Sequence, residues 1–216
     1  MSQNRTFPIG TLVLFLVWLV LMAIAFVWWR PDVKEVPEEL QAVLWPQPRP
    51  TQSIALMDQQ RKAFNETRLH GRWSFVFFGY THCPDICPTS MLTLKQVSNL
   101  LSESPETDEQ TQFVFVSVDP DRDTPEVLAN YISYFDEDFI GATGTKANID
   151  QMTMQFGAGY AKDSGPQSDR DTYLISHTAS YFLVDPRGRI AGAFSPPHDP
   201  DTIASQFEEI REFFQP

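Results

Sequence analysis

A buried-looking strand that runs directly into two closely spaced cysteines constrains the fold of this chain more than any other feature. The run from Ser74 to Tyr80 is rich in Phe and Val, which is typical of a central strand covered on both faces. Beyond Cys83 and Cys87, apolar residues recur at helical spacing: Met91, Leu92, Leu94, Val97, Leu100 and Leu101. The order strand, loop, helix places the cysteines past the carboxyl end of a strand, where open α/β sheets gather ligands and reactive groups.

The following segments continue this alternation. Gln112 to Val118 predicts a second buried strand, and Thr124-Pro125-Glu126 has the cap, proline and acid that open a helix. Phe139 to Ala142 predicts a short third strand, followed by a helix that carries Ile149, Met152, Met154 and Phe156. These alternations predict a right-handed βαβ core with parallel strands.

The end of the chain has a different pattern. Ala179 to Val184 and Ile190 to Phe194 flank a turn at 185–188 and predict a β-hairpin, and a terminal amphipathic helix carries Ile203, Phe207, Ile210 and Phe214. A βαβ unit followed by ββα is the thioredoxin order of elements. We therefore expect an α/β, thioredoxin-like fold with a central mixed sheet flanked by helices.

The amino-terminal part predicts a membrane anchor. No residue between Arg5 and Arg30 is charged, and the apolar run at 9–29 is long enough to span a bilayer as one helix. A cleaved signal peptide is the alternative, because Ala23-Ile24-Ala25 resembles a cleavage site. The domains expected are thus a tail at 1–8, an anchor at 9–29, a Pro-rich spacer at 30–50 and one globular domain at 51–216.

The flanking charges do not decide the orientation of this anchor, since the positive charge of Arg5 and the amino terminus on one side is nearly balanced by that of Arg30 and Lys34 on the other. A very short amino-terminal tail usually stays in the cytoplasm, and no Arg/Ser-rich transit peptide precedes the span. We therefore expect a single-pass protein of a bacterial inner membrane with its domain on the periplasmic side.

Composition narrows the partners and the role of the cysteines. With 16 basic and 28 acidic residues, the formal charge of −12 disfavours nucleic acid and suits cationic partners, although the same charge also serves simply as a soluble surface. Only two cysteines occur, four residues apart, so they indicate a site rather than a disulfide framework.

Two thiols on one helical turn can share an ion or form a disulfide. A helix amino terminus favours the thiolates of Cys83 and Cys87, which could bind a soft ion such as Cu(I) or exchange with another disulfide. A copper ion needs a further donor, and the motif does not choose among His70, His82, His177 and His198. His177 interrupts strand-like sequence, which suits a ligand or a hydrogen-bonded core residue. His82 adjoins Cys83, whereas His70 and His198 are expected to be solvated.

The segment from Phe78 to Pro88 resembles the signature of the SCO/SenC family, copper proteins that help to assemble cytochrome c oxidase. The resemblance continues through 116–125, Gly141 to Gly144 and His177 to Gly188, and covers about residues 51–214. It implies that Cys83, Cys87 and His177 bind copper, as Cu(I) or Cu(II), and that His82 is at a variable position. The family often has a glycine soon after Asp58, where this chain has Gln59 and Gln60, so the boundaries of an opening hairpin at 54–72 are less defined.

Three acids are candidates to support the site. Asp85, Asp119 and Asp123 could orient the ligands or bind a partner. Asp123 or Thr124 could equally be an ordinary helix cap.

The resemblance implies a metallochaperone without enzymatic turnover. It would pass copper to the oxidase subunit that carries the dinuclear copper centre, and other copper chaperones or thiol reductants could be further partners. The alternative is a thiol:disulfide oxidoreductase that reduces the cysteines of that subunit through Cys83 and Cys87. The C-x-x-x-C spacing and the lack of a proline directly before Ser176 favour metal over general redox catalysis. Peroxidase activity is a third hypothesis, by analogy of fold alone.

Overall fold

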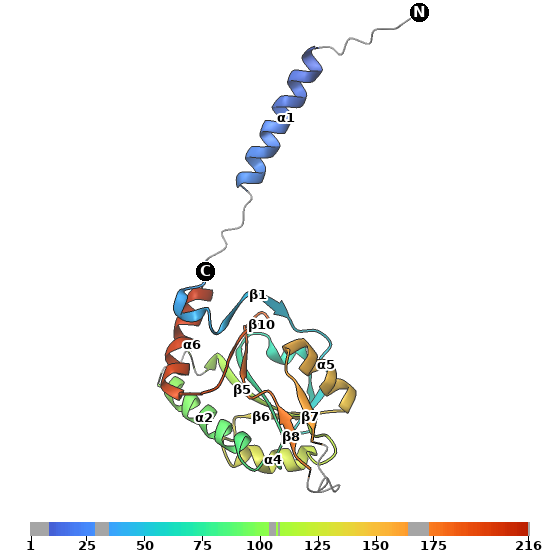
Figure 1. Ribbon diagram of the computed structural model, residues 1–216, viewed down its shortest axis with the longest axis vertical. Coiled ribbons are helices and arrows are strands. Elements are labelled where there is room, and N and C mark those ends of the chain that lie inside the picture. Colours follow the sequence, from blue (N-terminus) through green and yellow to red (C-terminus); the bar gives the residue numbers. More distant parts are fainter. Residues whose placement is uncertain (1–8, 29–34, 104–106, 108, 164–172, 216) are drawn as a thin grey trace, which may run out of the picture. The chain divides into compact units, whose positions relative to one another are not determined.

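The computed structural model describes all residues except 1–8, 29–34, 104–106, 108, 164–172 and 216 (Figure 1). The chain forms two compact units, residues 1–35 and 36–216, which are described separately. The first contains helix α1, Ile9–Trp28, in which the residues at 10–26 are exposed and mostly apolar. Among the residues that the structure describes, none of the helices combines the length and hydropathy needed to cross a bilayer, so the predicted anchor at 9–29 is not confirmed.

The second unit is built on an eight-stranded mixed sheet with the order β1-β10-β9-β4-β5-β6-β2-β3. Its centre is β4, Trp73–Gly79, in which every residue is buried. β4 runs parallel to β5, Thr111–Ser117, which runs parallel to β6, Ile140–Thr143. On its other side, β4 pairs antiparallel with β9, Tyr181–Val184, which forms a hairpin with β10, Arg189–Phe194. The predicted α/β fold with a central mixed sheet is confirmed, with strand ends shifted by one or two residues.

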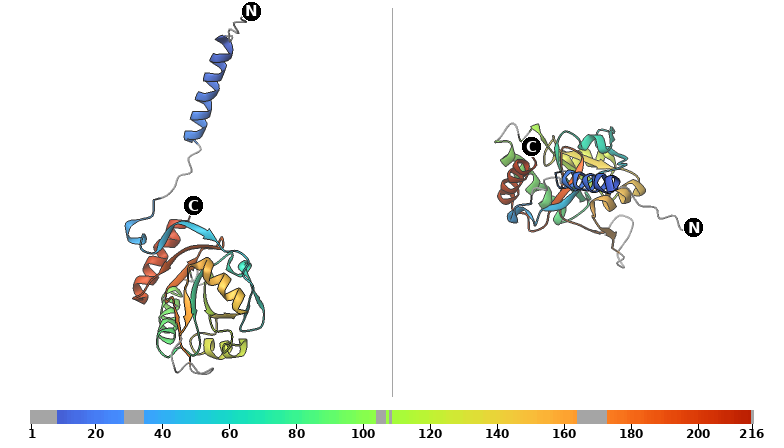
Figure 2. Two further views of the ribbon diagram at one scale, coloured as in Figure 1. Left: turned by 45° about the vertical axis from the view of Figure 1, so that its right-hand side comes forward. Right: turned by 90° about the horizontal axis from the view of Figure 1, so that it is seen from above.

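Four helices in the described part of this unit flank the sheet. They are α2, Ile86–Leu101; α4, Pro125–Ser133; α5, Lys146–Phe156; and α6, Pro200–Phe214. α2 and α6 lie side by side (Figures 1 and 2). The predicted start of α4 is confirmed, because the Thr124 hydroxyl accepts a hydrogen bond from the Val127 N–H and Pro125 opens the helix. α5 carries the four apolar residues predicted for this helix, of which Met154 is 79% exposed.

The sheet starts earlier than predicted. β1, Leu44–Pro50, lies in the segment expected to be a spacer and pairs antiparallel with β10. Its prolines do not prevent this, because β1 is an edge strand and a proline can direct its missing donor away from the partner. The backbones of these two segments approach so closely that a Cβ on Gly192 would lie 2.1 Å from the Val43 carbonyl oxygen. The compact unit accordingly begins at Val36 rather than at 51.

The opening hairpin is present but short. β2, Leu56–Asp58, pairs with β3, Ala63–Phe64, and with β6. Gln59 extends the pairing with β6, because its side chain donates to the Phe139 carbonyl at 2.8 Å and accepts from the Gly141 N–H at 2.9 Å. This glutamine contributes two hydrogen bonds at a place where the resemblance suggested a glycine.

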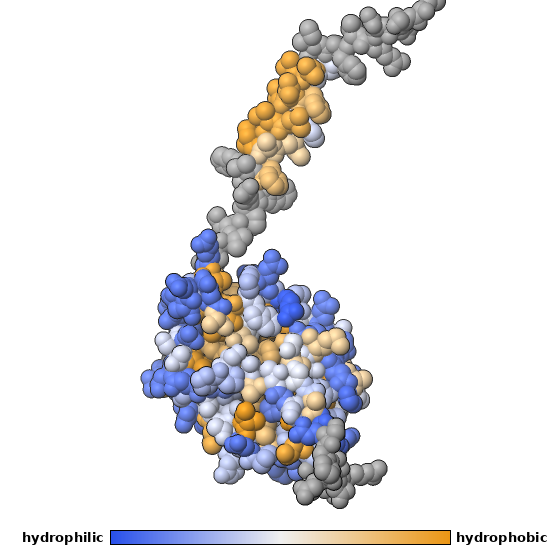
Figure 3. Space-filling model, in the orientation of Figure 1, coloured by the Kyte–Doolittle hydropathy of each residue, from blue (hydrophilic) through white to orange (hydrophobic). Residues whose placement is uncertain are grey.

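A second, two-stranded sheet was not predicted. β7, Tyr160–Lys162, pairs antiparallel with β8, Ile175–His177. Two short 3₁₀ helices, η1 at Glu38–Leu40 and η2 at Glu66–Leu69, complete the described elements. On the face drawn in Figure 3, the domain is largely hydrophilic and its apolar residues are scattered. Its core is aromatic, with Phe64, Phe75, Phe77, Phe78, Phe115, Phe156 and Phe207 at most 1% exposed.

Candidate metal centre

The two cysteines lie at the junction between the end of β4 and the start of α2. After Gly79 the chain makes a turn in which the Cys83 N–H donates to the Tyr80 carbonyl at 3.3 Å, and α2 begins at Ile86. Cys87 therefore lies in the first turn of α2 and is fully buried, whereas Cys83 precedes the helix and is half-buried. This is the predicted position at the carboxyl end of the central strand.

His177 reaches the cysteines from the second sheet. It is the last residue of β8 and is paired with Tyr160 of β7. The next residue, Thr178, is clasped to Gly159: the Thr178 N–H donates to the Gly159 carbonyl at 2.9 Å, and the Thr178 hydroxyl accepts from the Gly159 N–H at 2.9 Å. This clasp fixes the backbone on which the imidazole is mounted.

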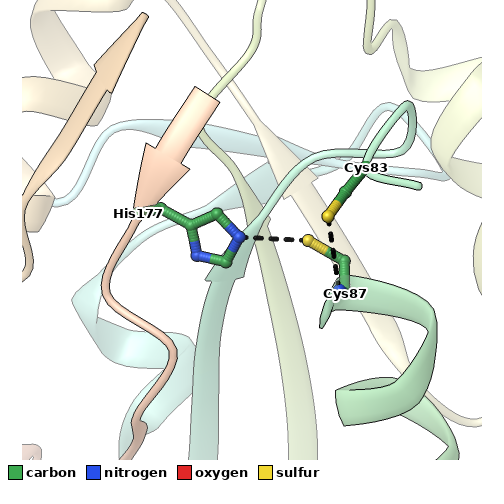
Figure 4. A group of neighbouring side chains, drawn as sticks. All are labelled: Cys83, Cys87 and His177. Carbon is green, nitrogen blue, oxygen red and sulfur yellow. Dashed lines mark hydrogen bonds between the residues drawn. The ribbon is translucent and has the colours of Figure 1, made fainter. Parts of the chain in front are cut away.

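The three side chains converge (Figure 4). The ligand atoms of Cys83, Cys87 and His177 all lie within 4.8 Å of one another, and in the described part of the chain they are the one such group of three. The Cys87 Sγ is 3.2 Å from His177 Nε2, and the Cys87 N–H donates to the Cys83 Sγ at 3.4 Å. Two donors that share an ion at about 2.3 Å can be at most about 4.6 Å apart, so small shifts would suit the group to one ion. Both thiols are free.

The protein environment selects the form of His177 that binds metals. Its Nδ1 lies 3.1 Å from the Thr178 carbonyl, which can only accept, so Nδ1 carries the proton. Burial lowers the pKa of His177, and the Thr178 carbonyl only partly opposes this. The ring is therefore neutral near pH 7 and directs the Nε2 lone pair at Cys87, which donates its S–H in the free protein.

The two thiols differ in acidity. Burial would raise the pKa of Cys83, but the N–H groups of Asp85, Cys87 and Ile86, together with the Cys87 thiol, lower it on balance. Burial strongly raises the pKa of Cys87, and the neighbouring Cys83 and Asp123 raise it further. Cys83 is thus the more acidic and more accessible thiol of the pair, and Cys87 keeps its proton until an ion displaces it.

A family model described as SCO1/SenC matches residues 47–212, which is most of the chain. The chain belongs to this family. A protein of Stutzerimonas stutzeri that is named as a copper-binding protein is 36% identical to this chain over 180 residues. These residues cover 83% of this chain and 85% of that protein. Arabidopsis thaliana ScoI with copper bound is 30% identical, with a TM-score of 0.67, covering 77% of this chain and 98% of that one. Yeast Sco1 with copper bound is 29% identical, with a TM-score of 0.69, covering 78% and 92%. The thioredoxin-like prediction agrees with these structures.

The predicted supporting acids of this SCO1/SenC protein have different surroundings. Asp123 is fully buried and accepts from the Thr81 N–H at 3.0 Å, the Thr81 hydroxyl at 2.6 Å and the Ser117 hydroxyl at 2.5 Å. It therefore holds the turn before Cys83 and does not cap α4, which Thr124 does. The exposed Asp85 does not cap α2 with its side chain, although its N–H lies against the Cys83 thiol.

Asp119 anchors the other side of the site. It is buried and accepts from the Tyr173 hydroxyl at 2.5 Å and from Arg122 Nε at 2.5 Å. Two cations lie against the Tyr173 ring, with Arg122 Cζ at 3.6 Å and Lys162 Nζ at 3.2 Å from its centroid. Lys162 is the last residue of β7, and Tyr173 lies two residues before β8. These contacts therefore join the two-stranded sheet that carries His177 to the loop after β5.

The remaining histidines lie outside the group. His70 is exposed, as expected. His198 was expected to be solvated, but its ring stacks on Tyr181 with centroids 3.8 Å apart and Nε2 lies 3.1 Å from the Phe194 carbonyl. The sequence interpretation also missed Thr178, Gly159 and Tyr173, which hold β8 in place. The adjacency of Thr178 to His177 was the one local signal for them.

Proposed function

We propose that this SCO1/SenC protein is a copper metallochaperone for the assembly of cytochrome c oxidase, with Cys83, Cys87 and His177 as its copper ligands. One observation supports the proposal most strongly: two sulfurs and a neutral imidazole nitrogen converge within 4.8 Å. Thiolate and imidazole together suit Cu(I) and Cu(II) and exclude the oxygen-preferring ions. Copper-bound relatives with the same fold support the choice of metal.

The geometry suggests how copper is held and released. Binding displaces the protons of both thiols, which pass to water, and breaks the contact between Cys87 and His177 Nε2. Cu(I) needs the two sulfurs with or without the imidazole, whereas Cu(II) takes all three donors. Cys83 is the more exposed sulfur and the better thiolate, so an acceptor thiol can displace it first while Cys87 still holds the ion.

The recipient that we propose is the copper-bearing subunit of cytochrome c oxidase, with copper coming from another chaperone. The acidic surface favours basic partners over nucleic acid. We further propose that residues 9–29 anchor the protein to a bacterial inner membrane and that the domain lies on the periplasmic side. The uncharged apolar run supports this location. In this role the protein transfers an ion and catalyses no reaction.

Copper titration of the purified protein under anaerobic conditions tests the ligand set. The wild type should bind one copper per chain and show, with Cu(II), a sulfur-to-copper charge-transfer band. His177→Ala should change this band and the Cu(II) magnetic resonance spectrum, and Cys83→Ser should weaken binding of both oxidation states. His198→Ala is the matched control, because it removes a partly buried histidine outside the group. Unchanged spectra for both His177→Ala and Cys83→Ser would exclude the proposed site.

A second function is favoured by the unequal thiols. Cys83 is accessible with a lowered pKa, and Cys87 is buried behind it, which suits a nucleophile and a resolving thiol. The Cys83 thiolate would attack a substrate disulfide and form a mixed disulfide. Cys87 would then displace the substrate, so that one substrate disulfide becomes two thiols and Cys83–Cys87 becomes a disulfide.

The two functions differ in their need for His177. A thiol oxidoreductase should reduce a model disulfide as fast in His177→Ala as in the wild type, and should not require copper. Tight copper binding that depends on His177, with slow disulfide exchange, supports the metallochaperone.

A further inference from the structure

His82 occupies a turn beside the metal centre and is not part of it. It lies between Thr81 and Cys83 in the turn closed by the Cys83 N–H and the Tyr80 carbonyl. Its side chain is 49% exposed. Cys87, by contrast, is fully buried, so an arriving ion meets the exposed side of the turn first.

A hydrogen bond to Thr81 orients the imidazole of His82. The Thr81 hydroxyl donates to Asp123 at 2.6 Å, so its oxygen is left to accept from His82 Nδ1 at 3.0 Å. With Nδ1 held in this way, Nε2 is the ring nitrogen left to bind an ion, and no contact of Nε2 is found within the described part of the chain. His177 is held in the same way, with its Nδ1 hydrogen-bonded to a carbonyl. Metal-binding histidines commonly have this arrangement, in which the second ring nitrogen donates to the protein.

The alternative role of His82, as an ion-pair partner of Asp123, is less well supported. The Nδ1 atom is 3.7 Å from the nearest Asp123 oxygen. Asp123 already accepts three shorter hydrogen bonds from Thr81 and Ser117. The carboxylate is therefore satisfied without His82, and the contact fixes the ring more than it neutralises the acid.

We propose that His82 is a loading ligand, which binds incoming copper through Nε2 and passes it to Cys83 and then to Cys87 and His177. This inference rests on the proposed copper-binding function. The transfer is a ligand exchange without a change of oxidation state: the His82–copper bond breaks as the copper–sulfur bonds form, and the thiol protons pass to water. Because His82 is absent from the final site, it should change rates and not the equilibrium.

Stopped-flow mixing of the apo protein with Cu(II), followed through the charge-transfer band, tests the proposal. His82→Asn keeps a donor for the Thr81 oxygen and removes the imidazole nitrogen. We expect loading to slow about tenfold, which corresponds to a rise of about 1.4 kcal/mol in the barrier. Removal of copper by a chelator should slow by the same factor, with the dissociation constant and the final spectrum unchanged. Asp85→Asn is the control, because it removes an exposed charge near the turn without removing a nitrogen donor.

The possible results distinguish the proposed copper-binding function from the loading role of His82. If the wild type binds no copper, the proposed function itself is wrong. If the wild type binds copper and His82→Asn loads at the same rate, only the loading role is wrong. A weaker dissociation constant and an altered spectrum in His82→Asn would also overturn it, because they would make His82 a permanent ligand.

Discussion

Gly79 is the position at which one methyl group should disturb both the core and the metal centre. It is the last residue of β4, directly before the turn that leads to Cys83. A Cβ at this position would lie 2.8 Å from Phe115 Cε2, 3.0 Å from the Cys87 Sγ and 3.2 Å from Phe77 Cε1. Carbon atoms pack best at about 3.5–4.0 Å, so the nearest contact is too short by roughly 0.7 Å or more.

The three neighbours have little room to yield. Phe77 and Cys87 are completely buried and Phe115 is 1% exposed. Overpacking of a well-packed core costs about 1–3 kcal/mol, and we expect Gly79→Ala to lie near the upper limit. For a domain of this size, about 3 kcal/mol lowers the melting temperature by roughly 6–12 °C. The new methyl group should also displace the Cys87 sulfur from His177, which is 3.2 Å away in the wild type.

Urea unfolding followed by fluorescence measures the first effect, and the Cu(II) charge-transfer spectrum measures the second. Gly159→Ala is the matched control, since its Cβ would meet only the Thr178 hydroxyl at 3.9 Å, an ordinary contact. It should change the free energy of unfolding by less than about 1 kcal/mol. If Gly79→Ala is as stable as Gly159→Ala and keeps the wild-type spectrum, the packing argument is refuted.

Two further changes test the supports of the site, and a third tests the contribution of His198 to stability. Thr178→Val removes two hydrogen bonds to Gly159 and should lower the free energy of unfolding, measured in urea, by about 1–2 kcal/mol. It should weaken the binding of Cu(II) more than that of Cu(I), because only His177 loses its support. Asp123→Ala leaves three donors without an acceptor and should cost roughly 3–5 kcal/mol, whereas Asp123→Asn should cost clearly less; equal losses would exclude the hydrogen-bond explanation. Burial lowers the pKa of His198 and the Phe194 carbonyl partly opposes it, so the neutral ring stabilises the fold above about pH 6.5, and this stability is lost as the pH falls through the lowered pKa. Urea midpoints between pH 7.5 and pH 5 should therefore fall less steeply in His198→Asn, and identical slopes would contradict the assignment.

The parts of the fold that follow from local pattern could be predicted. β4 and β5 are continuous apolar runs because both faces of the sheet are covered. Thr124 caps the start of α4, and Pro125 is the first residue of the helix. The position of the cysteines followed from the order strand, loop, helix. The choice of His177 as third donor came from resemblance, since the local pattern did not decide between it and His82.

Other features depend on contacts that no local pattern encodes. The Pro-rich β1 resembles a spacer because its prolines would break a central strand, and only its place at the sheet edge makes them harmless. β8 has only three residues, too few for a periodic signal, and its partner β7 lies before a segment outside the described residues. His198 was misjudged for a similar reason, because a Pro-rich setting gave no sign that its ring stacks on Tyr181.

The division of the site between near and distant residues has a chemical consequence. Cys83 and Cys87 are brought together by a turn and one turn of helix, so their sulfurs stay neighbours whenever the start of α2 is formed. His177 is 90 residues from Cys87, and its position depends on the Thr178–Gly159 clasp and on the stack at Tyr173. The two-sulfur set that Cu(I) needs is therefore local, whereas the nitrogen that Cu(II) adds requires the tertiary structure. A movement of β8 alone, with the sheet intact, would change the preference of the site between the two oxidation states.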